Sequence, residues 1–298
     1  MIVKRSKVKG FVMKTSVDLR KLEKIKEAIR EKEKIVVMFS GGVDSTLLAK
    51  LAYDVLGNNA IAVTIDSPVI PRSEIRDAIQ IAKLIGIRHE VIEIDELRNK
   101  YLVENPPDRC YLCRKFRDAI VKNWAKRIGF DVVADGLHYT DLEDYRPGIA
   151  ASTEDGIWHP FIEFQVTKDE IREYSRLLGL PTWSKPSVAC LCSRFPYGFG
   201  LTRERVEMVE KAEEFLKSLG FREVRVRYFP YNIAIIEVDD IEKAIKEKNR
   251  IIEQLKAIGF SFISVDLEGF KSGKLNRTVL WYYLKEEKHD QSKHLSIQ

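Results

Sequence analysis

The feature that most constrains the fold is a continuous apolar run that ends in two adjacent glycines. Ile35-Val-Val-Met-Phe39 has no polar position, as expected of a strand that is buried on both faces of a parallel sheet. Ser40-Gly-Gly42 follows directly, and residues 43–55 are predicted to form a helix. A strand, a tight glycine turn and a helix in this order are typical of a parallel sheet whose strands are joined by helices.

The same alternation continues along the first two thirds of the chain. Residues 60–65, 89–94 and 132–134 are predicted strands, and residues 19–34, 72–85 and 113–128 are predicted helices. This pattern predicts the α/β class with a doubly wound, Rossmann-like parallel sheet. Such a sheet binds ligands beyond the carboxyl ends of its strands, where the turn at Ser40 and the pair Asp135-Gly136 are expected to lie.

The segment Ser40-Gly-Gly-Val-Asp-Ser45 has the residues that phosphate binding requires. Gly41 and Gly42 let the backbone approach a ligand without a Cβ in the way, and the amides at the helix start point at an anion. Ser40 and Ser45 add hydroxyl donors, and Asp44 can hold a magnesium ion against the phosphates. No Gly-Lys-Ser/Thr follows, so this is not a Walker A loop. The segment resembles the SGGxDS signature of the PP-loop superfamily (the N-type ATP pyrophosphatases), which implies cleavage of ATP between its α and β phosphates.

The pattern changes near residue 201. A helix is predicted over residues 203–219, paired strands over 223–228 and 233–238, a helix over 241–258, and a half-buried strand over 262–267. We therefore predict a PP-loop domain over residues 1–200 and a smaller C-terminal α+β domain, for substrate binding or oligomerisation, over residues 201–288. The polar residues 289–298 are expected to form a frayed tail.

Composition narrows the functional classes. No apolar run is long enough to cross a bilayer, and the basic N-terminus lacks the apolar stretch of a signal peptide, so a cytoplasmic location without a membrane partner is expected. The net charge of +5 suits phosphates or acidic metabolites and is too small to argue for nucleic acid by itself.

Four cysteines form two close pairs. Cys110 and Cys113 form a C-x-x-C at the start of a predicted helix, and Cys190 and Cys192 form a C-x-C in a loop. The helix start and the neighbouring arginines are expected to lower the thiol pKa values and favour thiolates. Four interpretations remain open at this point: a [4Fe–4S] cluster held by the first pair and one of the second, a zinc ion held by all four, a single cysteine that carries sulfur, and small buried side chains.

Further segments resemble the LarE family of ATP-dependent sulfurtransferases, which act in nickel-pincer nucleotide biosynthesis. After the phosphate loop and Asp135-Gly136, the resemblance is carried by residues 144–148, 193–198, 224–227 and 267–273, and it covers nearly the whole chain. It implies adenylation of a carboxylate of pyridinium-3,5-biscarboxylate mononucleotide with release of pyrophosphate. Sulfur then displaces AMP and leaves a thiocarboxylate.

Members of this family differ in how sulfur is supplied. Some sacrifice one cysteine, but Ala189 stands at that position here, and Cys110 and Cys113 are additional. The resemblance therefore implies the version with a [4Fe–4S] cluster, held by Cys110, Cys113 and Cys190, with a zinc ion as the alternative occupant. Cys192 is the substitute for the third ligand, and Cys190 and Cys192 both count as candidate catalytic residues. An iron without a protein ligand would accept sulfur from sulfide or another donor.

The remaining candidate site residues lie after the cysteines. Arg225 and Arg227 alternate along a predicted strand, so they face the same side and can grip a phosphate, and the resemblance places substrate phosphate there. Ser193 and Arg194 can position substrate or AMP, and the resemblance gives Glu213 a catalytic role.

Asp66 and Ser67 lie just past the second predicted strand, where adenosine could rest, and the alternative is that both are turn residues. His138 and His159 are interpreted as structural, because their spacing does not suggest a metal site.

Three other classes of function remain as alternatives. A PP-loop tRNA thiolase would need a broad basic surface, which this C-terminal unit lacks, and nucleic acid is therefore not the expected partner. An ammonia-dependent amidating synthetase would not need four cysteines near its site. A non-catalytic ATP-binding module with structural zinc is the third. We also expect a homo-oligomer, as in other members of the family.

Overall fold

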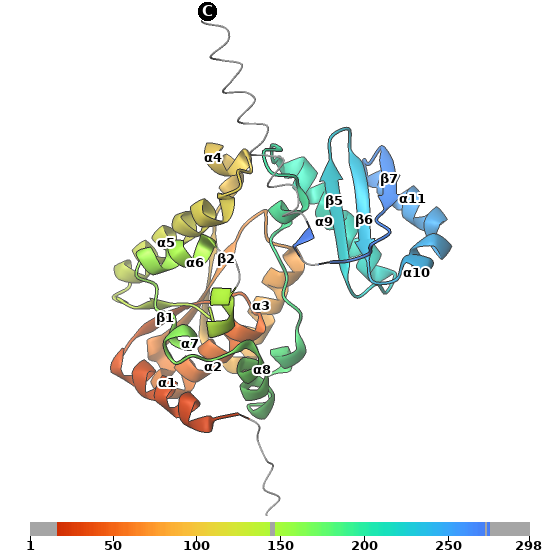
Figure 1. Ribbon diagram of the computed structural model, residues 1–298. Helices are drawn as coiled ribbons and strands as arrows, with labels where there is room; N and C mark the ends of the chain where they lie inside the picture. Colours follow the sequence, from red (N-terminus) through yellow and green to blue (C-terminus); the bar gives the residue numbers. More distant parts are fainter. Residues whose placement is uncertain (1–16, 144–146, 272, 275–298) are drawn as a thin grey trace, which may run out of the picture.

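The predicted alternation of strands and helices folds into a four-stranded parallel sheet in the order β3-β2-β1-β4. Figure 1 shows this part of the chain on the left and a second, smaller unit on the right. The computed structural model describes residues 17–143, 147–271 and 273–274. The strands are β1 (Ile35–Met38), β2 (Ala60–Asp66), β3 (Arg88–Glu93) and β4 (Val133–Ala134). The α-helices of this part are α1 (Leu19–Glu31), α2 (Val43–Leu56), α3 (Arg72–Ile85), α4 (Lys100–Val103), α5 (Arg109–Arg127), α6 (Pro147–Glu154), α7 (Pro160–Glu163) and α8 (Lys168–Leu177).

Helices cover both faces of this sheet, as the apolar strands require. Alternate residues of β1 point to opposite faces, so Val37 packs with α1, α2, α3 and α8, whereas Val36 packs with Val121 and Ala125 of α5. Strand β1 has β2 on one side and β4 on the other. The chain therefore reverses its winding direction beside β1, and the crevice at a reversal of this kind is where doubly wound sheets bind ligands.

The second unit contains the predicted antiparallel pair and one further strand. Its elements are α9 (Arg203–Ser218), β5 (Val224–Phe229), β6 (Ile233–Val238), α10 (Ile241–Lys246), α11 (Lys248–Ile258) and β7 (Phe262–Val265). Strand β6 pairs antiparallel with β5 and parallel with β7. The single helix predicted over residues 241–258 is two helices that meet at Glu247, a break that neither Gly nor Pro marks in the sequence.

The two units meet along the segment that carries the second cysteine pair. Leu191, Cys192 and Phe195 pack into the apolar core of the C-terminal unit, together with Val69 of the N-terminal unit. The backbone N–H of Leu191 donates to the carbonyl of Val69 at 2.8 Å. This segment is therefore held between the units, next to the carboxyl end of β2.

No helix within the described residues is long and apolar enough to cross a membrane. The predicted tail over residues 289–298 lies outside the described residues, as do residues 144–146 and 272 of the segments that carry the family resemblance.

Candidate active site

A cavity of about 400 Å³ opens at the carboxyl ends of β1, β2 and β4. Apolar side chains from β1, β2 and the start of α3 form one side of it, and the glycine-rich loop forms another. The predicted residues Ser40, Gly42, Asp44, Ser45, Asp135, Gly136 and Cys190 all line this cavity. Its place in the sheet and its lining agree with the predicted nucleotide site.

The phosphate loop is held in shape by its own serines. The Ser45 hydroxyl accepts from the backbone N–H of Ser40 at 3.2 Å and donates to the carbonyl of Gly42 at 3.3 Å. Gly41 has a φ of +69°, and a Cβ there would lie 2.8 Å from the Cα of Ala78 in α3. Gly41 therefore allows both the left-handed turn and the close packing of the loop against α3.

Asp44 faces a lysine that sequence reasoning missed. The Lys168 ammonium lies 2.6 Å from both carboxylate oxygens of Asp44. A magnesium ion at Asp44 would share the carboxylate with this lysine. The helix start at Lys168 carries a local signal, because Thr167 and Glu170 form a capping box. Nothing local in the sequence points to its pairing with a loop 124 residues away.

Asp135 is a buried acceptor in the wall of the nucleotide cavity. Its carboxylate oxygens lie 2.7 Å from His159 Nδ1 and 2.5 Å from Arg114 Nη2, and the backbone N–H of Leu137 donates to it at 3.1 Å. Burial alone would raise the pKa of Asp135, but the hydrogen bond with His159 and the charge of Arg114 outweigh it and lower that pKa. Asp135 therefore supports the cavity wall, and His159 has the structural place expected of it.

Gly136 lies against the backbone of the phosphate loop. A Cβ at this position would be 2.8 Å from both the carbonyl carbon of Asp44 and the backbone nitrogen of Ser45. We predict that Gly136→Ala displaces the loop at a cost of about 1–3 kcal/mol, the usual range for overpacking. If that cost falls on the nucleotide-bound state, ATP binds roughly 5- to 150-fold more weakly. The measurement is the KM for ATP in pyrophosphate release.

Gly200→Ala is the matched control, because a Cβ there would find its nearest neighbour only at 4.0 Å. An unchanged KM for ATP in Gly136→Ala would contradict the close contact.

All four cysteines line a second cavity of about 190 Å³. Cys110 and Cys113 lie in the first two turns of α5, and Cys190 and Cys192 reach the cavity from the segment between the two units. Two stretches that are about 80 residues apart in sequence thus converge, as the cluster interpretation requires. The lining also contains Glu96, Arg109, Arg114 and Arg117, which sequence reasoning did not assign to the site.

The two cavities share part of their walls. Cys190, Arg114 and Arg117 line both the nucleotide cavity and the cysteine cavity. Cys192 lines only the cysteine cavity, and its side chain is buried in the core of the C-terminal unit. The geometry therefore distinguishes Cys190, the third ligand predicted from the family resemblance, from its substitute Cys192.

The thiols do not all ionise as expected. A hydrogen bond from the Cys192 thiol and the charges of Arg109, Arg117 and Arg194 hold the pKa of Cys190 well below its ordinary value. Accordingly, the Cys192 pKa is raised, because its proton is held by that hydrogen bond and its thiol is buried. Burial raises the pKa of Cys113 to about 11, and the nearby Glu96 carboxylate acts in the same direction. The prediction that the thiol pKa values are lowered is correct for Cys190. It is wrong for Cys113 and Cys192, because burial of these two thiols raises their pKa more than the nearby arginines lower it.

Within the described residues, no three His, Cys, Asp or Glu side chains gather closely enough to bind a single metal ion. A mononuclear zinc site needs its thiolates about 2.3 Å from one ion. Soft thiolates are also the donors that iron–sulfur clusters use, and there each cysteine binds a different iron. The four thiols around one cavity are donors of the type that such a cluster uses.

Arg194 and Glu213 lie behind the cysteine segment. The Arg194 guanidinium binds both carboxylate oxygens of Glu213, at 2.8 and 2.9 Å, and both side chains are buried. Arg194 also donates to the carbonyls of Ala189 and Cys190, at 2.9 and 3.0 Å. Neither Arg194 nor Glu213 lines the nucleotide or the cysteine cavity, so their contacts position the backbone at Cys190.

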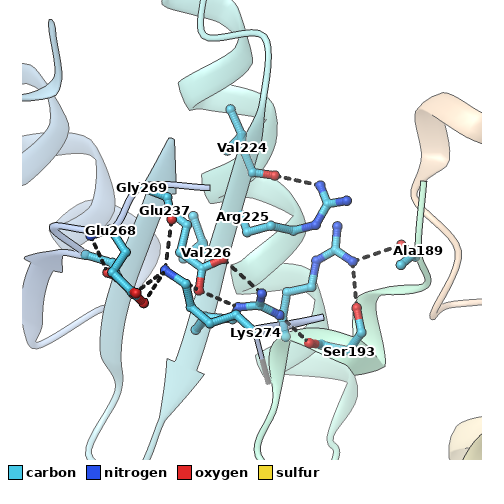
Figure 2. A network of polar contacts seen from close by, with 12 residues as sticks. Ala189, Ser193, Val224, Arg225, Val226, Glu237, Glu268, Gly269 and Lys274 are labelled. Atoms are coloured by element: carbon cyan, nitrogen blue, oxygen red, sulfur yellow. Dashed lines mark hydrogen bonds and ion pairs between the residues drawn. The ribbon is translucent and has the colours of Figure 1, made fainter. Parts of the chain in front are cut away.

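The two arginines of β5 differ from one another (Figure 2). Arg227 is bound by both oxygens of Glu237, at 3.0 and 2.9 Å, and donates to the carbonyl of Ser193 at 2.7 Å. Arg225 makes no ion pair within the described part of the chain and lies over the ring of Phe270 at 4.9 Å. Burial lowers the pKa of Arg225 to about 10, and the charges of Arg194 and Arg227 contribute to this. Of the two, Arg225 is the cation without a carboxylate partner among the residues that the structure describes.

Asp66 lies apart from the nucleotide cavity. It forms an ion pair with Arg72 and lines a different, open cavity of about 640 Å³ beside α9. The neighbouring Ser67 is buried and donates to Glu96. The structure therefore does not place Asp66 with the other predicted nucleotide ligands.

The sequence of this chain is similar to those of several known proteins. The family model for NAD synthase matches residues 18–126, which contain the phosphate loop. An uncharacterized protein of Synechocystis is 42% identical, covering 87% of this chain and 98% of the relative. The pyridinium-3,5-bisthiocarboxylic acid mononucleotide synthase of Lactiplantibacillus plantarum is 36% identical, covering 85% of this chain and 92% of the relative.

A more distant match is a tRNA-specific 2-thiouridylase of Thermoanaerobacter pseudethanolicus, which is 28% identical over 70% of this chain and 67% of the relative. The match to the Lactiplantibacillus enzyme extends over nearly its whole length, through both units. The chain belongs to the LarE family of ATP-dependent sulfurtransferases, within the PP-loop superfamily, whose members use ATP and Mg²⁺.

Proposed function

We propose that this protein adenylates a carboxylate of pyridinium-3,5-biscarboxylate mononucleotide and replaces an oxygen of that carboxylate with sulfur, as a step towards the nickel-pincer nucleotide. The substrate class is supported by the name of the Lactiplantibacillus relative, whose product is the corresponding bisthiocarboxylic acid. The observation on which the proposal rests is that Cys190 lines both the nucleotide cavity and the cavity formed by the four cysteines.

The first half of the reaction uses the nucleotide cavity. The loop amides and the Ser40 and Ser45 hydroxyls bind the phosphates of ATP, and Asp44 holds the magnesium ion. The substrate carboxylate attacks the α-phosphorus, and pyrophosphate leaves with the electron pair of the broken P–O bond. Arg225, which has no carboxylate partner in the described part of the chain, is proposed to bind the substrate phosphate, while Arg227 keeps the backbone at Ser193 in place.

The second half takes place where the cavities meet. Cys110, Cys113 and Cys190 are the proposed ligands of a [4Fe–4S] cluster, and all three line the cysteine cavity. When bound, such a cluster would supply one iron position without a protein ligand, suited to a sulfur anion. Arg194 and Glu213 act as positioning residues. Arg194 donates to the backbone carbonyls of Ala189 and Cys190, and Glu213 holds the Arg194 guanidinium in place. Ser193, bound by Arg194 and Arg227, belongs to the same support.

The test is anaerobic purification followed by two measurements on the same protein. We expect iron and acid-labile sulfide in the wild-type protein, and pyrophosphate release that depends on the dicarboxylated pyridinium nucleotide. Cys110→Ala is expected to lose the iron and the thiocarboxylate product but to keep pyrophosphate release. Zinc in an active, iron-free protein would overturn the cluster assignment. Pyrophosphate release that does not depend on this nucleotide would overturn the proposed substrate.

The alternatives make different predictions. An ammonia-dependent synthetase would form AMP in response to ammonia. This alternative is supported by the match to the NAD synthase family model, which covers the ATP-binding part of the chain and not the C-terminal unit. A tRNA thiolase would bind tRNA with a strong dependence on salt. The cytoplasmic location, the homo-oligomer and the domain boundary at residue 200 remain predictions from the sequence.

A further inference from the structure

Arg117 occupies the boundary between the two cavities, and no role has been assigned to it. It lies on α5, one turn after Cys113, and its side chain reaches the wall shared with Cys190 and Arg114. Any sulfur that passes from the cysteine cavity to a carbonyl in the nucleotide cavity must pass this wall. A guanidinium at that point stands beside the atoms that react.

The contacts of Arg117 leave its terminal nitrogens available as donors. Its Nε lies 2.7 Å and its Nη2 2.6 Å from the same carboxylate oxygen of Glu96. Glu96 is itself buried and held by the hydroxyl of Ser67. Within the described part of the chain, Nη2 is buried without a hydrogen-bond partner in spite of this ion pair, and Nη1 makes no hydrogen bond either. The hydrogen bond from Nε to Glu96 thus fixes the direction of Arg117, while its terminal N–H groups are available to a ligand in the cavities that Arg117 lines.

Arg114 lines the same wall but is less suited to bind a further anion. Its Nε donates to both oxygens of Asp118, at 2.7 and 2.8 Å, and its Nη2 lies 2.5 Å from Asp135. Two carboxylates therefore face one guanidinium, and their combined charge outweighs that of Arg114. Arg117 faces one carboxylate, together with the thiols of Cys113 and Cys190.

We propose that Arg117 is a catalytic residue of the sulfur-transfer step and binds the oxyanion that forms on the activated carboxylate. This inference rests on the proposed function. A hydrosulfide anion attacks the carbonyl carbon of the acyl-adenylate, a C–S bond forms, and the C=O electron pair moves onto oxygen. That pair returns as the C–O bond to AMP breaks, AMP leaves with the bonding electrons, and the sulfur proton passes to solvent. A terminal N–H of the Arg117 guanidinium donates to the oxygen while it carries the negative charge.

Two partial reactions separate this role from others. ATP–pyrophosphate exchange in the presence of the dicarboxylated nucleotide reports adenylation, and single-turnover formation of thiocarboxylate with added sulfide reports transfer. In Arg117→Gln, we expect exchange and iron content to stay near wild-type values and transfer to fall by about 100-fold, the scale of losing one oxyanion donor. Arg117→Lys, which keeps the charge but not the forked donor, should lose less.

Arg127→Gln is the matched control, because Arg127 is exposed on the same helix and lines neither cavity. A parallel loss of exchange in Arg117→Gln would make Arg117 an ATP ligand, and a loss of iron would make it a support of the cluster. Either result, or unchanged transfer, overturns the proposal. If the wild-type protein itself shows no exchange with this nucleotide, the proposed function fails first, and the role of Arg117 fails with it.

Discussion

Cys190→Ala is expected to abolish thiocarboxylate formation while ATP is still cleaved. Cys190 is the cysteine that lines both cavities, so its loss removes the proposed cluster ligand nearest the activated carboxylate. The phosphate loop does not depend on its side chain. We expect transfer to fall by about a thousandfold or more, as when an essential catalytic group is removed, and pyrophosphate release to persist. Both are measured anaerobically on the same preparation.

Cys192→Ala is the matched comparison. The Cys192 thiol lines only the cysteine cavity, is buried in the core of the C-terminal unit and donates to Cys190. We expect this variant to keep its iron and to lose only part of its transfer activity, because the raised pKa of Cys192 disfavours the thiolate that a metal requires. The reverse order, with Cys192→Ala inactive and Cys190→Ala active, would show that the third ligand has been assigned to the wrong cysteine.

Glu213→Gln is expected to lower the free energy of unfolding by the largest amount. Glu213 and Arg194 form a buried pair with two hydrogen bonds, and the Glu213 carboxylate also accepts from the backbone N–H of Val226 at 3.0 Å. Removing one charge leaves the other buried without compensation, which typically costs about 3–5 kcal/mol. The measurement is the free energy of unfolding from urea denaturation.

Glu214→Gln on the same helix is the control. Glu214 is largely exposed and lies 3.5 Å from Arg76, and a surface pair of this kind contributes about 0–1 kcal/mol. Equal decreases in the free energy of unfolding of the two variants would contradict the difference in burial between Glu213 and Glu214.

The same pair predicts a dependence of stability on pH. Burial alone would raise the pKa of Glu213, but the charge and hydrogen bonds of Arg194 lower it below the ordinary value of 4.5. The contribution of Glu213 is therefore complete above about pH 4.5, and it is lost as the pH falls through the lower pKa of the folded state. The wild-type protein should lose stability over this acidic range more steeply than Glu213→Gln.

The phosphate loop and its place at the end of a strand in a parallel sheet were predictable because their determinants are local. The apolar run at residues 35–39, the glycines and the helix after them lie within about twenty residues, and backbone geometry alone brings the loop to the edge of the sheet. The same reasoning gave helix α3 and strand β6 their observed bounds. The convergence of the two cysteine pairs followed from the family resemblance and not from spacing.

The burial of individual side chains and their ion pairs with distant residues could not be predicted from local sequence. Whether Cys190 or Cys192 faces the nucleotide depends on which thiol the C-terminal core covers, and that core is assembled from residues up to 260. Likewise the partners of Asp44, Arg194 and Arg227 come from other elements. The sequence by itself determined the chemistry available to this protein: a loop for phosphates, four thiols and several arginines. Only the tertiary structure decided which of these groups are desolvated and paired and which remain open to a ligand, because desolvation and pairing depend on segments that meet only when the chain is folded.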